Sequence, residues 1–133
     1  MRNIYLTAAL LVLGGCAMPS SDMQNNRYME RLAEPVPASM VGDWTGTMGP
    51  YLMTIRLAKD GNGVMCWAYS RNNTVYNLKY SAGNVYLQDG TRMELSQAGD
   101  LLTAKSPYLG TTSAKLYPDN GLAQAAPFCK QSL

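Results

Sequence analysis

The chain has 133 residues, with 11 Lys and Arg against nine Asp and Glu and no histidine. This length suits one domain, and the net charge of +2, carried by dispersed basic residues, gives no electrostatic reason to expect nucleic acid or anionic lipid as a partner. Without histidine the chain lacks the commonest metal ligand and the commonest general base. We therefore predict a protein that is not an enzyme and that needs no metal or cofactor.

The first 15 residues have the pattern of a signal peptide. Arg2 gives a short positive start, residues 4–13 are an apolar run, and two glycines precede Cys16. An apolar run of about ten residues is too short to cross ~30 Å of hydrocarbon as a helix. Residues 1–15 are therefore predicted to be removed. An ordinary secretory cleavage near Ala17 is the alternative to cleavage before Cys16.

The segment Leu13-Gly14-Gly15-Cys16 resembles the bacterial lipobox, in which an aliphatic and two small residues precede an acylated cysteine. The resemblance implies that Cys16 becomes the first mature residue and attaches the protein to a membrane through a lipid anchor. Ala17 follows, where lipoproteins retained in the inner membrane typically carry aspartate. The resemblance thus implies the outer membrane of a double-membrane bacterium, and we place the domain on its periplasmic face.

Residues 16–39 are predicted to form the lipidated N-terminus and a flexible tether, followed by a β domain over 40–133. Prolines, serines and asparagines dominate residues 16–39, and few residues there are able to build a core. An alternative role for this segment is a docking peptide for a partner.

From residue 41 onward the pattern has period two, with frequent turns. In residues 51–57 the apolar positions alternate with Thr54 and Arg56, and Asp89-Gly90 is a strong hairpin signal. No crossover helix is available for a parallel sheet, so we predict an all-β fold, an antiparallel barrel or sandwich of about eight strands with a short C-terminal helical turn. The predicted strands are 41–48, 51–57, 64–70, 74–80, 85–88, 91–96, 100–105 and 111–117, and the helical turn is 122–126.

Two cysteines, Cys66 and Cys129, remain once Cys16 is assigned to lipid. An even remainder in an exported chain favours a disulfide. Cys66 lies in a predicted strand and Cys129 lies near the C-terminus, which frays in most domains unless it is tied down. We predict a bond between them, and two buried free thiols are the alternative.

The segment Gly42-Asp43-Trp44 resembles the Gly-x-Trp signature of lipocalins, whose barrels hold small apolar ligands. The resemblance implies that Trp44 closes one end of a barrel against a basic residue of a late strand, for which Lys115 is the candidate. It also makes Trp44 and Trp67 candidate ligand-binding residues. The alternative is that Trp44 fills the core of a barrel too small to hold a ligand.

The domain is also similar to small periplasmic lysozyme inhibitors, and Ser81-Ala82-Gly83 matches a fragment of their inhibitory loop. Taken whole, the chain most resembles a group of small bacterial lipoproteins without an assigned activity. Our leading hypothesis is a non-enzymatic envelope lipoprotein that binds another envelope component or supports an assembly. The alternatives are a lipocalin-like barrel for a small apolar ligand and an inhibitor of an external hydrolase such as lysozyme.

Overall fold

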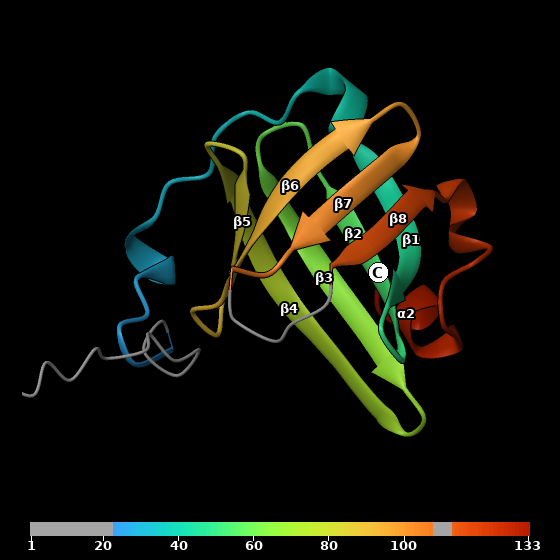
Figure 1. Ribbon diagram of the computed structural model, residues 1–133. Coiled ribbons are helices and arrows are strands. Elements are labelled where there is room, and N and C mark those ends of the chain that lie inside the picture. The colour runs from blue at the N-terminus through green and yellow to red at the C-terminus, as the bar shows by residue number, and fades with distance from the viewer. Residues whose placement is uncertain (1–22, 108–112) are drawn as a thin grey trace, which may run out of the picture.

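The fold is a closed antiparallel β-barrel (Figure 1). The computed structural model describes residues 23–107 and 113–133, so the predicted signal peptide, Cys16 and part of the predicted strand 111–117 lie outside it. In the described residues eight strands each pair with the next, and the last pairs with the first, which confirms the all-β prediction. The strands are β1 (Gly42–Met48), β2 (Tyr51–Leu57), β3 (Asn62–Tyr69), β4 (Asn72–Ser81), β5 (Asn84–Leu87), β6 (Arg92–Ala98), β7 (Leu101–Lys105) and β8 (Ala114–Pro118).

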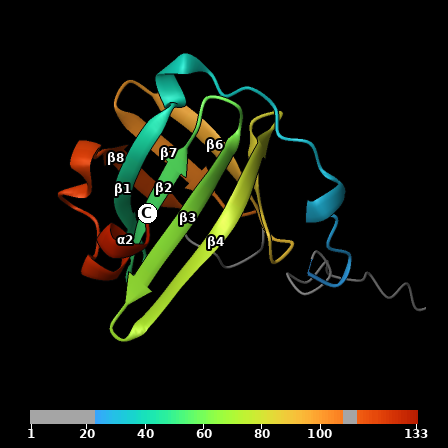
Figure 2. The same cartoon turned by 180° about the vertical axis from the view of Figure 1, so that it is seen from behind.

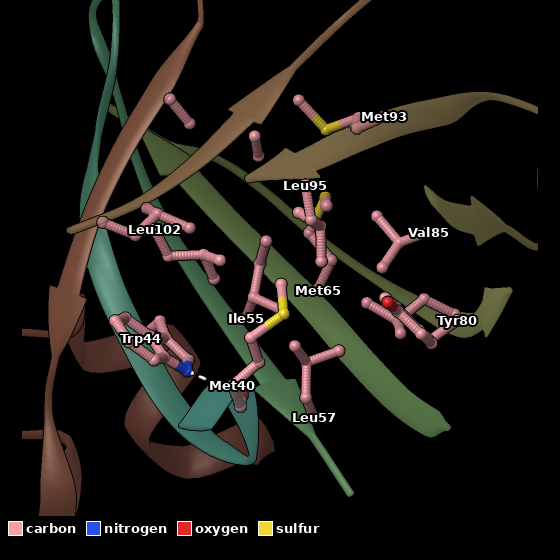
Figure 3. Close-up of a cluster of buried hydrophobic side chains, with 14 of the residues drawn as sticks. Met40, Trp44, Ile55, Leu57, Met65, Tyr80, Val85, Met93, Leu95 and Leu102 are labelled. Atoms are coloured by element: carbon pink, nitrogen blue, oxygen red, sulfur yellow. Dashed lines mark hydrogen bonds between the residues drawn. The ribbon is translucent and has the colours of Figure 1, made fainter. Parts of the chain in front are cut away.

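Alternation along the strands fills the barrel interior with apolar side chains. In β2, Met53, Ile55 and Leu57 point inward and are at most 1% exposed. In β6, Met93 and Leu95 point inward, as the sequence pattern predicts. Figure 3 shows side chains from several strands converging in this interior. The centre of the barrel is therefore packed with side chains, as expected for a barrel of eight strands.

A second apolar cluster lies on the outer face of the barrel. It is formed where the C-terminal segment packs against β3 and β4, beside β1 in both ribbon views (Figures 1 and 2). The single helical turn predicted at 122–126 is instead a 3₁₀ turn, η3 (Asn120–Leu122), followed by a helix, α2 (Pro127–Ser132). Proline is favoured at the first position of a helix, so Pro127 sets where α2 begins. The buried members of the cluster are Cys66, Leu122, Ala125, Ala126 and Cys129.

Cys66 and Cys129 are joined in a disulfide, with their Cα atoms 5.8 Å apart. Both cysteines are fully buried. The bond therefore fastens α2 to the outside of β3 and holds the C-terminus against the barrel.

Residues 26–40, named here the strap, lie against the barrel and do not form the free tether predicted through residue 39. The strap contains two 3₁₀ turns, η1 (Tyr28–Glu30) and η2 (Ala38–Met40), and it runs beside β5 from one end of the barrel to the other (Figure 1). Val36 and Met40 are both 6% exposed and belong to the main core. These two buried apolar side chains attach the segment to the core, although most of its residues are polar or proline.

The strap closes one end of the barrel, the end opposite the β1–β2 and β5–β6 turns. Trp44 is 3% exposed there, and its indole Nε1 donates a hydrogen bond of 2.9 Å to the Met40 carbonyl (Figure 3). Val36 N donates to the Lys59 carbonyl in the β2–β3 turn. The strap thus satisfies polar groups at this end as well as filling it. No helix in the described residues is long and apolar enough to span a membrane.

Candidate ligand-binding site

The opposite end of the barrel, named here the mouth, holds an apolar pocket of about 290 Å³. It lies among the β1–β2 turn, the β5–β6 turn, the start of β6 and Trp67 of β3. Its apolar walls come from Met48, Pro50, Tyr51, Trp67, Leu87 and Met93. A hollow of about 270 Å³ next to it is lined by Met48, Tyr51 and Trp67. Methionine side chains adapt to irregular apolar groups, so this pocket suits an apolar ligand.

An aromatic cluster extends from this pocket along β2, β3 and β4. The Trp67 ring lies 5.7 Å from Tyr76 in an edge-to-face arrangement and 6.3 Å from Tyr51. Tyr51 in turn lies 5.5 Å from Tyr69. Tyr51 is 36% exposed and Tyr69 is 46% exposed, so the apolar surface that begins in the pocket continues onto the solvent-exposed surface of the barrel. Such rings present a large contact area with little conformational freedom to lose on binding.

Of the two tryptophans predicted to bind a ligand, the structure brings only Trp67 to this pocket. Trp44 lies at the strap-closed end and packs with Met40, which corresponds to the core-filling alternative. The lipocalin-derived pairing of Trp44 with Lys115 does not form. Lys115 is exposed and opposes Thr47 in the β1–β8 register, which places it on the outer face while Trp44 points inward.

The Ser81-Ala82-Gly83 segment, matched to a lysozyme-inhibitor loop, comprises the last residue of β4 and the turn into β5. The Ser81 hydroxyl donates a 2.6 Å hydrogen bond to the Glu34 carboxylate, which also accepts from Ala82 N. The Ser81 hydroxyl and the Ala82 N–H, which an inhibitory loop would present to an enzyme, are therefore hydrogen-bonded to the strap instead. Inhibition of a hydrolase stays an untested prediction.

The mouth residues Met48 and Met93 were not singled out as binding residues by the sequence. Each stands at the end of a strand next to a turn, where an apolar residue that points inward lines the opening and not the centre. The Gly49-Pro50 and Asp89-Gly90 turn signals mark that end of the barrel. Combining the strand alternation with these turns identifies the mouth, but only once the strand order is known.

Comparison with known proteins decides the family. The family model described as "Bacterial lipocalin LPS transport optimiser YedD" matches residues 25–133. The chain belongs to the YedD family. The match begins before η1, so it includes the strap as well as the eight strands.

Two solved structures share the fold of this YedD-family chain. One is a lipoprotein YedD from Klebsiella pneumoniae, with a TM-score of 0.57 and 13% identity over 80% of this chain and 92% of that one. The other is a candidate lipoprotein from Streptococcus pneumoniae, with a TM-score of 0.52 and 12% identity over 64% of this chain and 98% of that one. No curated protein matches the chain.

The YedD family assignment confirms the coarser part of the sequence-based prediction, a bacterial envelope lipoprotein. The family description names transport of lipopolysaccharide (LPS) and not a reaction. Acylation at Cys16, the choice of membrane and the binding partner stay predictions.

Proposed function

We propose that this YedD-family chain is an outer-membrane lipoprotein, anchored through Cys16 and facing the periplasm, that assists LPS transport without catalysing a reaction. The observation that carries the proposal is the match of residues 25–133 to a family described as an LPS transport optimiser. The mouth supports it, because an exposed apolar pocket with aromatic walls is a surface for binding another envelope component.

The same pocket favours a second candidate function, binding of a small apolar ligand. Its volume of about 290 Å³ is close to the ~300 Å³ at which ligand pockets begin. Because the centre of the barrel is filled, the pocket has room for part of a ligand, such as the end of an apolar chain, and not for enclosure of a whole one.

The transport proposal is tested by deleting the gene in its own bacterium and following newly made LPS to the cell surface in a pulse–chase experiment. We expect slower arrival in the deletion strain. Full-length protein and Tyr117→Ala, an exposed outer-face control, restore the rate, whereas Cys16→Ala and Trp67→Ala do not. An unchanged rate in the deletion strain would overturn the proposal.

The membrane assignment is tested separately by fractionation of cell membranes. The wild-type protein is expected in the outer membrane, and Ala17→Asp is expected to retain it in the inner membrane. Residence of the wild-type protein in the inner membrane would contradict the assignment without bearing on the fold.

A further inference from the structure

Three arginines from two distant parts of the sequence meet in one cleft beside the mouth. Arg27 and Arg31 come from the strap, and Arg92 is the first residue of β6. The cleft has a volume of about 310 Å³ and lies between the strap and the β5–β6 hairpin. The expectation of no anionic partner was drawn from the spacing of charges along the chain. Because the strap folds back along the barrel, these three positive charges lie close together in space although Arg92 is far from the other two in the sequence. The expectation of no anionic partner therefore does not hold for this cleft.

Tyr86 organises the cleft. The Arg31 guanidinium lies 3.5 Å from the centroid of the Tyr86 ring. Arg92 opposes Tyr86 across β5 and β6, and Lys79 opposes it across β4 and β5, so both cations lie on the same outer face as the ring. A guanidinium stacked on an aromatic ring keeps its planar edge of N–H donors available for an anion.

Hydrogen bonds hold the strap in place over this face. Asn26 Nδ2 donates to the Gln88 carbonyl at 2.8 Å, and Lys79 Nζ donates to the Tyr28 carbonyl at 2.9 Å. The Lys79 ammonium also lies 4.3 Å from the centroid of the Tyr28 ring. Burial raises the pKa of Tyr28, so this phenol brings no negative charge to the cleft at neutral pH.

No described carboxylate forms an ion pair with the three arginines. Across residues 23–107 and 113–133 the one ion pair joins Arg56 to Asp43 on the outer face of β1 and β2. Asp89, in the turn next to the cleft, accepts hydrogen bonds from Thr91 N and Thr91 Oγ1. Like charges in one cleft repel each other, and an anion with several oxygens relieves that repulsion while accepting their hydrogen bonds.

The cleft lies next to the apolar pocket, because Leu87 and Arg92 line both. A ligand with its anionic group on the arginines is therefore placed to lay an apolar chain against Trp67 and Met93. Phosphate fits the head position, since arginine binds its oxygens through paired N–H donors. An acyl chain fits the pocket, where each buried methylene is favourable.

The geometry points to a single site for a phosphorylated lipid, with the phosphate bound by Arg27, Arg31 and Arg92 and an acyl chain in the mouth. This inference deepens the proposed function and rests on it for the choice of a lipid. The lipid A part of LPS and a glycerophospholipid share this chemistry, and the experiment below separates them.

The position of the strap brings this site toward the anchoring membrane. The strap leaves the barrel at the mouth end, where Asn26 binds Gln88. Asn26 lies ten positions after the proposed anchor at Cys16, and a chain of that length spans at most ~35 Å. The site therefore stays within one extended tether of the bilayer surface, where phosphorylated lipids are found.

The inference is tested in living cells with the full-length lipoprotein carrying Tyr51→p-benzoylphenylalanine, a photoreactive residue at the mouth. After growth with radioactive phosphate and irradiation, we expect a protein–lipid adduct that contains phosphorus. Lipid A sugars in the adduct identify LPS as the source, and glycerophosphate identifies a membrane phospholipid; both support the site.

A triple variant, Arg27→Gln, Arg31→Gln and Arg92→Gln, tests the phosphate contacts. We expect it to lower the yield of adduct by roughly tenfold or more, equivalent to about 1.4 kcal/mol. Arg71→Gln, in the exposed β3–β4 turn, is the matched control and leaves the yield unchanged. Equal thermal melting of the variants shows that a loss of adduct is not a loss of fold.

Absence of an adduct, an adduct without phosphorus, or an unchanged yield in the triple variant would each overturn the inference. These results are distinguishable from failure of the proposed function. A deletion strain that slows LPS transport while no lipid adduct forms removes the lipid site alone, and an adduct without a transport defect removes the transport role alone.

Discussion

The carbonyl group of Glu34 lies against Gly61, at the place that a side chain on residue 61 would occupy. The strap crosses the β2–β3 turn at this point. Tyr80 joins the two segments, because its carbonyl accepts from Glu34 N at 2.8 Å and its N–H donates to the Gly61 carbonyl at 2.7 Å. Gly61 has φ +94°, which glycine adopts without steric cost. Closure of the barrel by the strap thus depends on the absence of a side chain at residue 61.

Gly61→Ala is therefore expected to lower the free energy of unfolding by roughly 2–4 kcal/mol, since it combines backbone strain with displacement of the strap. Gly99→Ala is the matched control. Gly99 also has a left-handed φ, +60°, but open space around it, so its variant should lose only about 1 kcal/mol. Chemical denaturation measures both, and equal losses would show that the Glu34 contact contributes nothing.

The disulfide makes a prediction about the C-terminus. Cys66 and Cys129 are separated by 63 residues, and the chain-entropy model gives a loop of that length about 4 kcal/mol. We expect Cys129→Ala to lower the melting temperature by about 10 °C or more. Reductant should lower the melting temperature of the wild type but not of the Cys66→Ala/Cys129→Ala variant. Alkylation of both cysteines in the denatured, unreduced protein would refute the bond.

The barrel and the approximate position of each strand were predictable because turn residues and period-two alternation are local signals, although β3 and β4 each begin two residues before the predicted strand. Tyr51–Leu57 forms β2 over the predicted residues, and the hairpin at Asp89-Gly90 connects β5 to β6. The burial of Thr54, which the pattern placed on the exposed face, was not predictable in this way. It follows from the outer cluster around the disulfide, whose contacts join residues that are far apart in the sequence.

Thr54 gives a test of that buried outer face. Its hydroxyl forms a 2.8 Å hydrogen bond with the Thr45 hydroxyl, and both residues are at most 5% exposed. Thr54→Val leaves the Thr45 hydroxyl buried without this partner, which is expected to cost about 1–3 kcal/mol. Thr45→Val/Thr54→Val should cost less than the sum of the two single variants, because neither hydroxyl is then left unsatisfied. Thr47→Val, exposed on β1, serves as the neutral control in denaturation measurements.

The candidate site was predictable only in part, and the reason is again distance along the chain. Trp67 was proposed from the lipocalin resemblance, which made both tryptophans of the chain candidate ligand-binding residues. The arginine cleft could not be predicted, because Arg27 and Arg31 reach Arg92 only after the strap folds back over β5. The strap itself carries few apolar residues, and its contacts with the closed end of the barrel, through Val36 and Met40, became visible only in the folded structure.

The two tryptophans report on opposite ends of the barrel, which gives a direct test of the site assignment. Trp44→Phe leaves Trp67 as the sole tryptophan, at the half-buried mouth, and Trp67→Phe leaves Trp44, which is 3% exposed. We expect acrylamide to quench the fluorescence of the Trp44→Phe variant strongly and that of the Trp67→Phe variant weakly. Trp44→Phe should also lose about 1–3 kcal/mol of stability, since the Met40 carbonyl loses its indole donor.

A lipid bound at the mouth should protect Trp67 from acrylamide and leave Trp44 unaffected. Equal quenching of the two variants, or protection of Trp44 by the lipid, would contradict the placement of the binding site at the mouth.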